Sequence, residues 1–213
     1  MKEIKFTSRA DAVFSQLESD ILTGVYKRGE IITEIGLSTA LNVSRTPVRE
    51  ALRRLEQENL IKETSKGHEV IGISKNDIMD IYDIRIKIEP IAARLCAENI
   101  SNDAIEQLRD AVDLHEFYSK KRDDDKVKGA DSTFHEFIYK NTGSAVYEDI
   151  LLSLHRKVQL SRKTSLADIE RAEKAISEHR EIFNAIASRN GALAEQIMFE
   201  HVKNAKENIM RLS

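Results

Sequence analysis

The 213-residue chain carries 33 lysines and arginines against 36 aspartates and glutamates, a formal net charge of −3. This balance excludes a protein that binds polyanions through its overall charge. A hydrophobic content of 41% is enough for a real core, in one large domain or two small ones. The single cysteine, Cys96, excludes a disulfide within the chain. With no apolar signal core and no run of about 18 apolar residues, we expect a soluble, cytoplasmic protein that does not enter a membrane.

The first quarter of the chain predicts helix, turn and helix in close succession. Apolar residues at three- and four-residue spacing predict a helix over 7–22, and Thr33 is expected to cap a second helix over 34–41. A tight turn at Asn42-Val43 leads into an amphipathic helix, Val43–Leu60, in which the Ser44 side-chain oxygen is expected to cap the N-terminus. Elements joined this closely form a helix-turn-helix arrangement.

The third of these helices has two different faces. One is an apolar stripe, and the other carries arginine and threonine near the N-terminus, which suits insertion into a DNA major groove. There arginine pairs with guanine edges or phosphates, and threonine with phosphates or a thymine methyl group. An ordinary surface helix with solvated arginines would show the same pattern. The candidate DNA contacts on this helix are Arg45, Thr46, Arg49 and Arg53.

After Asn59 the hydrophobic period changes from 3.6 to 2, which predicts a β-hairpin. Its strands are expected at Leu60–Thr64 and Glu69–Ile73, joined through Ser65–His68. A hairpin directly after a helix-turn-helix is a wing, and a small basic tip suits a minor-groove or phosphate contact. A hairpin that only covers the small core is the alternative. The candidate contacts at the tip are Lys66, Gly67 and His68.

Positive charge in this part of the chain is local. Residues 1–70 hold 11 basic and 11 acidic residues, whereas Ser44–Arg54 alone holds four arginines and one glutamate. This is weaker than the strongly basic domain expected of a monomeric DNA-binding protein. A dimer presenting two such helices would overcome the difficulty, so we expect a homodimer.

From Ser74 onward every segment has the helical period. The predicted fold is therefore mainly α, with an N-terminal winged helix-turn-helix and small β-hairpin over residues 1–73 and an all-helical bundle over residues 74–213. The charged stretch Lys120–Lys126 is expected to be a solvated connection. The helices are expected at about 75–97, 102–122, 125–141, 145–163, 168–189 and 192–212.

Four residues of the helical part are candidate metal ligands. Asp131 and His135 lie four apart and so share one helix face, while His179 and His201 are each 11 residues from Asn190, at the turn between the last two helices. Equal spacing from the turn of an antiparallel pair gives equal height, roughly 16 Å from the loop. Three imidazoles and a carboxylate suit Zn²⁺, and also Ni²⁺, Mn²⁺ or Fe²⁺. Unrelated surface or core histidines are the alternative.

Arg85 is the candidate contact for a small acidic ligand, because it lies mid-helix in the first helix of the bundle. Its guanidinium could offer a fork to a ligand carboxylate. A plain ion pair with a nearby acid such as Asp83 or Glu89 would explain it equally well. His155, also mid-helix, could enter the same cluster.

Several stretches resemble one known family. The segment ILTGVYKRGEIITEIGLSTALNVSRTPVREALRRLEQENLI resembles the winged-helix domain of GntR-type bacterial transcription regulators. The helical half resembles the FCD-type effector domain of the FadR-like subgroup in IYDIRIKIEPIAARLCAE, the D-x3-H of DSTFH, EHREIFNAI and the late His201. The chain departs from the family pattern at Arg28, where a proline is usual, and at Ser144, where an asparagine is usual.

The resemblance implies DNA contacts at Arg45, Thr46 and Arg49 and metal ligation by Asp131, His135, His179 and His201. It also implies that the helical domain dimerises and binds a small organic acid beside the metal. We therefore expect a ligand-responsive regulator, a repressor rather than an enzyme, that binds a palindromic double-stranded DNA operator as a homodimer. A metal-dependent hydrolase using the Asp/His₃ set is the rival interpretation, and a purely structural metal is a third.

Overall fold

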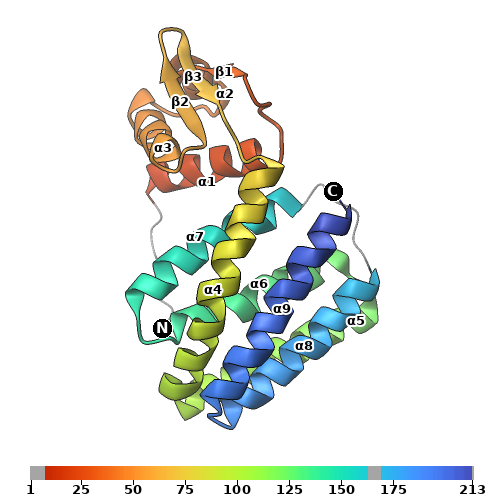
Figure 1. Ribbon diagram of the computed structural model, residues 1–213. Coiled ribbons are helices and arrows are strands. Elements are labelled where there is room, and N and C mark those ends of the chain that lie inside the picture. Colours follow the sequence, from red (N-terminus) through yellow and green to blue (C-terminus); the bar gives the residue numbers. More distant parts are fainter. Residues whose placement is uncertain (1–7, 163–168, 213) are drawn as a thin grey trace. The chain divides into compact units, whose positions relative to one another are not determined.

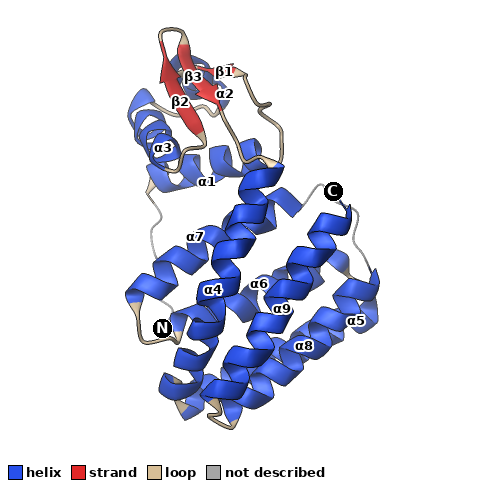
Figure 2. Cartoon of the chain, in the orientation of Figure 1, coloured by secondary structure: helices blue, strands red, loops and turns tan. Residues whose placement is uncertain are grey.

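The computed structural model describes residues 8–162 and 169–212. The N-terminal unit extends to Ser74, and the C-terminal unit begins at Lys75, one residue from the boundary expected from the sequence. Strands are confined to the N-terminal unit within the described residues (Figure 2). Each unit has its own hydrophobic core. None of the helices in the described part of the chain is long and apolar enough to cross a membrane.

The N-terminal unit is a winged helix-turn-helix (Figure 1). Its sheet is antiparallel with the order β1-β3-β2, so the short strand before the second helix pairs with the second strand of the hairpin, which is central in the sheet. The sequence predicted the hairpin and a short extended piece within 26–32, but not that this piece pairs with the hairpin as a third strand. The elements are α1 (Arg9–Leu22), β1 (Ile31–Ile32), α2 (Glu34–Ala40), α3 (Arg45–Gln57), β2 (Ile61–Thr64) and β3 (Gly67–Val70).

The hairpin is tighter than predicted. Thr64 pairs with Gly67, so the connecting loop is the two-residue Ser65-Lys66 rather than a four-residue segment. Gly67 makes this register possible, because its φ of +137° suits glycine and a Cβ there would lie 2.7 Å from the backbone oxygen of Ile32. The expected second strand, 69–73, therefore begins two residues too late and ends three residues too late.

Of the two side-chain helix caps predicted in this unit, one forms and one does not. The Thr33 side chain accepts a hydrogen bond from the Gly36 backbone N–H, as expected of an N-cap. Ser44 stands at the N-cap of α3 but makes no side-chain cap hydrogen bond, so that expectation was wrong. Its hydroxyl is not used by the helix, although its backbone is extended as an N-cap requires. The apolar faces of α1 and α3 meet in the core of this unit.

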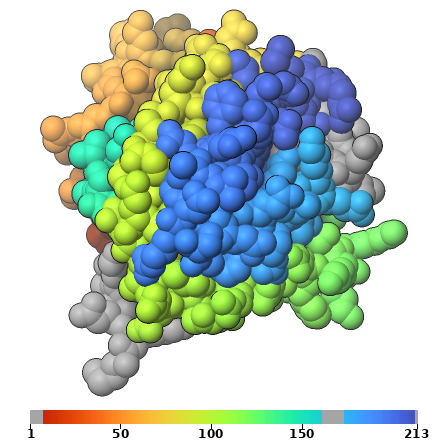
Figure 3. All heavy atoms as spheres, turned by 60° about the horizontal axis from the view of Figure 1, so that its bottom comes forward, coloured from red at the N-terminus to blue at the C-terminus, as the bar shows by residue number. Residues whose placement is uncertain are grey.

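The C-terminal unit consists of helices in its described residues. These are α4 (Lys75–Asn99), α5 (Asn102–Lys121), α6 (Asp124–Lys140), α7 (Ala145–Arg162), α8 (Ile169–Ala187) and α9 (Gly191–Leu212). The outer surface in Figure 3 shows α9, in blue, beside α8 in lighter blue and α4 in yellow-green.

The connection between α5 and α6 lies within the charged, solvent-exposed stretch 120–126 as expected, but only Arg122 and Asp123 are outside the two helices. α5 ends as Arg122 adopts a left-handed conformation with φ of +54°. Asp123 then caps α6 by accepting a hydrogen bond from the Lys126 backbone N–H. The acidic residues at the start of α6 lie where the helix dipole favours negative charge, so the same residues that look like a linker are a good helix start.

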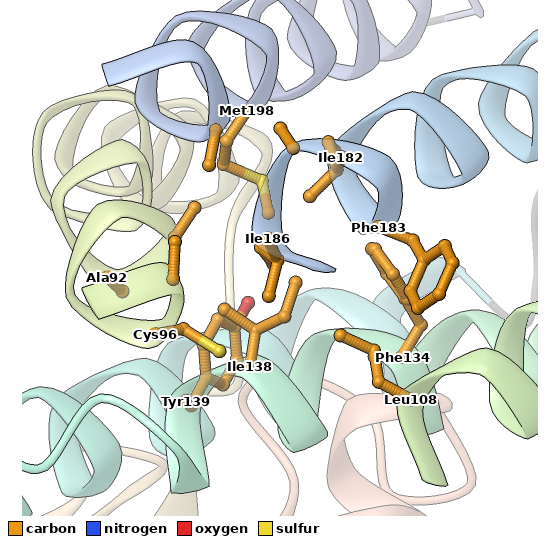
Figure 4. Close-up of a cluster of buried hydrophobic side chains, with 14 of the residues drawn as sticks. Ala92, Cys96, Leu108, Phe134, Ile138, Tyr139, Ile182, Phe183, Ile186 and Met198 are labelled. Atoms are coloured by element: carbon orange, nitrogen blue, oxygen red, sulfur yellow. The ribbon is translucent and has the colours of Figure 1, made fainter. Parts of the chain in front are cut away.

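The core of the C-terminal unit is formed by apolar side chains from all six helices, α4 to α9, and Figure 4 shows part of this cluster. Phe134, Ile138 and Tyr139 project from α6 into this cluster, opposite Ile182 and Ile186 of α8. These side chains are fully buried or nearly so. The packing fixes the height and rotation of each helix and thereby places the polar residues of the same helices.

Candidate nucleic-acid interface and candidate metal centre

The exposed face of α3 carries the arginines that the sequence singled out. The Arg45 side chain is 58% exposed and the Arg49 side chain 68% exposed, and Thr46 and Arg53 are exposed as well. The opposite face packs into the core through Val48, Ala51, Leu52 and Leu55. The predicted division of this helix into an apolar and a basic face is therefore what the structure shows.

One carboxylate organises the two leading arginines. Glu34, the first residue of α2, accepts hydrogen bonds from Arg45 Nε at 2.6 Å and from Arg49 Nη2 at 3.0 Å on one oxygen, and from Arg49 Nε at 3.1 Å on the other. The hydrogen bonds from Arg49 and Arg45 lower the pKa of Glu34. The carboxylate thus holds both guanidinium groups together at the start of α3. Sequence reasoning missed it because Glu34 precedes Arg45 by 11 residues and Arg49 by 15.

The fourth arginine of this helix is turned away from that face. Arg54 Nη1 donates to Asp11 at 2.7 Å, and its guanidinium lies 4.0 Å from the centre of the Phe14 ring on α1. Arg54 therefore stabilises the packing of α3 against α1. This leaves Arg45, Arg49 and Arg53 as the arginines of α3 that face outward.

The wing places the three candidate contacts differently from one another. Lys66 is exposed in the two-residue loop, at the tip of the hairpin. Gly67 is the first residue of β3, and His68 pairs with Glu63 and Ile32 inside the sheet, where it is half-buried. The tip is thus Ser65-Lys66, and His68 was wrongly placed at it because the loop was taken as two residues too long.

In the C-terminal unit, three predicted ligands converge. His135 of α6, His179 of α8 and His201 of α9 are buried, and ligand atoms from all three lie within 4.8 Å of one another. His179 Nε2 is 3.4 Å from His201 Nε2, and His201 Nε2 is 3.2 Å from His135 Nε2. The equal spacing of His179 and His201 from the turn does bring them to one height.

Asp131 lies at the edge of this cluster, one turn before His135 on α6. Its Oδ1 atom is 3.7 Å from His179 Nε2, while its Oδ2 atom accepts a hydrogen bond from Gln159 Nε2 at 2.8 Å. Burial alone would raise the pKa of Asp131, but the imidazoles of His135 and His179 outweigh burial and hold that pKa far below its usual range. The carboxylate is therefore ionised and adds a negative charge to the three rings.

The second nitrogen of each ring has a partner of its own. His201 Nδ1 is 2.7 Å from Glu178 Oε2, and His179 Nδ1 is 3.1 Å from Nδ1 of His115 on α5. His135 Nδ1 is 2.8 Å from Glu89 Oε1 on α4, a close contact although the ring is not aligned for a straight hydrogen bond. Metal-ligating histidines characteristically have such outer partners, which fix the ring and its tautomer.

These outer contacts indicate which ring nitrogens carry a proton and which present a lone pair to the centre of the cluster. We assign the proton of His201 to Nδ1, because Glu178 can only accept, and the carboxylate of Glu89 makes the same assignment for His135. Their Nε2 atoms then face each other as two lone pairs 3.2 Å apart. Burial and then the neighbouring rings of His201 and His135 lower the pKa of His179 well below its usual value, so this ring is neutral. A cluster of inward lone pairs beside a carboxylate fits a divalent cation.

Arg85 is engaged within the protein. Its Nε donates to Glu89 Oε2 at 2.8 Å and its Nη2 to Glu89 Oε1 at 3.2 Å, in a pair that is almost completely buried. The Tyr139 hydroxyl donates to the same Glu89 oxygen. The ion pair that the sequence left open as one interpretation of Arg85 is therefore present, with Glu89 and not Asp83 as the partner. Glu89 in turn connects α4 to His135 of the cluster.

A winged helix-turn-helix with an exposed arginine face, followed by a helical domain with a buried histidine cluster, defines a two-domain transcription regulator. Comparison with protein families agrees: residues 9–67 match the gntR family of bacterial regulatory proteins, and residues 80–204 match the FCD domain. The chain belongs to the GntR family of transcription regulators and carries an FCD domain, so it is not an enzyme.

Comparison with individual proteins indicates the same class of protein, a transcription regulator. The HTH-type transcriptional regulator YdhC of Bacillus subtilis is 27% identical over 198 residues, which cover 92% of this chain and 88% of YdhC. The gluconate operon transcriptional repressor of Bacillus licheniformis is 27% identical over 195 residues, covering 87% and 80%. The structure of McbR/YncC of E. coli has a TM-score of 0.79 at 19% identity, covers 97% of this chain and 99% of that one, and shows the same fold. These comparisons give no support to a hydrolase.

Proposed function

We propose that this regulator is a repressor that binds a palindromic operator as a homodimer and responds to a small organic acid bound at a metal in its helical domain, acting in the cytoplasm. The observation that carries the proposal is the convergence of three histidine Nε2 atoms and Asp131 in the domain attached to an arginine-faced α3. The likeness to a gluconate operon repressor supports the repressor assignment.

On the DNA side, Arg45, Thr46, Arg49 and Arg53 would contact bases and phosphates, and Lys66 of the wing tip would reach a phosphate or the minor groove. Gly67 and His68 lie in β3 and would support the DNA contact of the wing by holding its tip in position. Because residues 1–70 have no net positive charge, one copy of α3 gives a weak electrostatic contribution. Two copies on two half-sites double it, which is why the proposal includes a dimer.

On the effector side, Asp131, His135, His179 and His201 would hold the metal, with Zn²⁺ preferred and Ni²⁺, Mn²⁺ or Fe²⁺ also suited to this donor set. The metal supplies a Lewis-acidic charge to which a ligand carboxylate can bind. Glu89, Glu178 and His115 orient the ligating rings. The buried positive charge of Arg85 would attract the organic acid electrostatically, while its guanidinium remains bound to Glu89. The response requires that the acid bind the two states of the dimer with different affinity.

The DNA part is tested with an operator selected from random DNA and measured at fixed salt. We expect Arg49→Ala to weaken binding by about 1–3 kcal/mol. Arg109→Ala, which removes an exposed arginine of α5, is the matched control and should leave affinity unchanged. Equal affinities of wild type and Arg49→Ala would show that the assigned surface is wrong.

The metal part is tested by elemental analysis of purified wild type and His179→Ala, and the oligomer by sedimentation at the concentrations used for DNA binding. We expect bound divalent metal in wild type and its loss in the variant, with His68→Ala as a control histidine outside the cluster. Addition of gluconate and other small acids to the protein–operator complex then tests the response. A metal whose removal unfolds the domain, with no acid altering operator affinity, would indicate a purely structural ion.

A further inference from the structure

Glu34 is a negative charge placed beside the surface that would meet DNA. It is the first residue of α2, a helix whose N-terminus is capped by the Thr33 side chain through the Gly36 N–H. The Glu34 side chain is only 20% exposed, because the two more exposed arginines of α3 lie against it. A carboxylate at this place repels phosphates, so it lowers rather than raises affinity for DNA in general.

The contact between Glu34 and Arg49 uses one edge of the guanidinium and leaves another edge for a ligand. Arg49 Nε and Nη2 donate to the two oxygens of Glu34 at 3.1 and 3.0 Å, a side-on pair of hydrogen bonds. A guanidinium has five N–H donors in one plane, so the hydrogens of Nη1 and the second hydrogen of Nη2 are not used by Glu34. Because two bonds to one carboxylate fix that plane, the remaining edge has a defined direction.

This remaining edge of Arg49 matches one base in the major groove. Guanine presents two acceptors there, N7 and O6, and arginine binds both through parallel N–H groups. Such a contact requires the guanidinium to lie in the plane of the base, whereas a contact to phosphate carries no sequence information. An arginine held in one plane therefore favours the base, and an arginine free to turn can follow the nearest phosphate.

The contact is suited to this role although its arginine side is exposed. Isolated exposed ion pairs contribute little, but pairs with bidentate geometry and pairs within a network of charges are exceptions. Glu34 meets both conditions, since Arg45 Nε donates at 2.6 Å to the same oxygen that accepts from Arg49 Nη2. Docking on DNA removes water from this surface, which strengthens the attraction between these charges.

We propose that Glu34 is a positioning residue for base recognition: it orients Arg49 so that the free edge of the guanidinium selects guanine, and its charge lowers affinity for unrelated DNA. The inference rests on the proposed binding of DNA by α3. It adds the base that Arg49 reads and the residue that makes Arg49 selective.

The experiment uses full-length protein, the operator selected from random DNA and an unrelated duplex of the same length, with affinities measured at fixed salt by fluorescence anisotropy. Further operators carry 7-deazaguanine, which lacks N7, at one guanine of each half-site in turn. Glu34→Gln removes the charge and keeps the size, and Arg49→Lys keeps the charge and loses the second edge. Glu50→Gln is the matched control, because Glu50 is an exposed carboxylate of α3 that contacts neither Arg45 nor Arg49 among the described residues.

We expect wild type to lose about tenfold in affinity when the guanine read by Arg49 lacks N7, and Glu34→Gln and Arg49→Lys to lose much less. Glu34→Gln should bind both duplexes more tightly, but the unrelated one by a larger factor, so that its preference for the operator falls about tenfold. Glu50→Gln should keep the preference of wild type. Melting temperatures show whether each variant is folded, and Arg49→Lys tests the same edge if Glu34→Gln does not fold.

Three results would overturn the inference: Glu34→Gln that keeps the operator preference and N7 dependence of wild type, Glu50→Gln that loses preference to the same extent, or wild type that tolerates 7-deazaguanine at every position. In each case, weaker binding by Arg49→Ala would leave the proposed function standing. Equal affinities of wild type and Arg49→Ala would overturn the assigned DNA-binding surface together with the inference.

Discussion

Glu89→Gln is the substitution for which the structure makes the strongest prediction. Glu89 is completely buried, and its carboxylate binds Arg85, Tyr139 and His135. Burial alone would raise its pKa, but Arg85 and then His135 outweigh burial, and the pKa of Glu89 lies well below its usual value. Replacement by glutamine removes the charge, keeps the size, and leaves the guanidinium of Arg85 buried without a counter-ion.

The magnitude follows from that unpaired charge. Breaking a buried ion pair on one side costs about 3–5 kcal/mol, whereas removing both charges is often nearly neutral. We therefore expect Glu89→Gln to lower the free energy of unfolding of the C-terminal unit by about 3–5 kcal/mol. Arg85→Met combined with Glu89→Gln should recover most of this loss. Tyr139→Phe removes one donor to the same carboxylate and should cost only about 1 kcal/mol.

The assay is urea unfolding of the metal-free protein followed by circular dichroism, with the two single variants and the double variant forming a cycle. The pH dependence gives a second test. Because the folded pKa of Glu89 is depressed, its contribution is complete above the unfolded value of about 4.5 and is lost as the pH falls below it. The gap between wild type and Glu89→Gln should therefore narrow by up to about 1.4 kcal/mol per pH unit below that value.

Two results would refute the reasoning. A loss below about 1 kcal/mol for Glu89→Gln would mean that Arg85 finds solvent or another partner, as an exposed pair does. A double variant that is less stable than Glu89→Gln would mean that Arg85 contributes through packing and not through its pairing with Glu89.

Three further substitutions test other parts of the structure. Glu34→Gln removes the carboxylate that holds Arg49, so we expect tighter operator binding and a steeper salt dependence, by about one unit of slope; unchanged salt dependence would count against the assigned surface. Gly67→Ala places a Cβ 2.7 Å from the Ile32 oxygen at a φ of +137°, and should destabilise the N-terminal unit by about 1–3 kcal/mol in thermal unfolding. His115→Phe removes the outer partner of a ligating ring and should weaken metal binding about 10- to 100-fold in a chelator competition, with equal affinity as the contrary result.

The sequence predicted the local features well because each depends on spacing alone. Helical periodicity located α3 and its two faces, and the four-residue spacing of Asp131 and His135 placed both on α6. The equal distances of His179 and His201 from Asn190 placed their rings at the same height. Such arguments need only the geometry of one helix or of one helical hairpin.

The features that the sequence did not predict depend on contacts between distant segments. His115 is 64 residues from His179, and Glu178 is 23 residues from His201, the ring it contacts, although it is next to His179 in sequence. No periodicity indicates which side chain from another helix will meet a given ring nitrogen. The wing register was missed for a related reason: the pairing of Thr64 with Gly67 depends on backbone freedom, and the strand residues alone allow either register.

If the proposed metal binds, the histidine cluster would also connect metal binding to the stability of the helical domain. The carboxylates of Glu178 and Glu89 keep a proton on the far side of the His201 and His135 rings, so these contacts set two lone pairs against each other at 3.2 Å. A cation relieves this repulsion, and only in the folded unit, where α6, α8 and α9 bring the rings together. Binding therefore adds to folding stability, by about 4 kcal/mol when free metal is 1,000 times its dissociation constant. That gain is as large as the loss expected for Glu89→Gln. If Glu89 is not needed for His135 to bind the metal, metal-loaded Glu89→Gln should be as stable as metal-free wild type. If Glu89 is needed, metal-loaded Glu89→Gln should remain less stable.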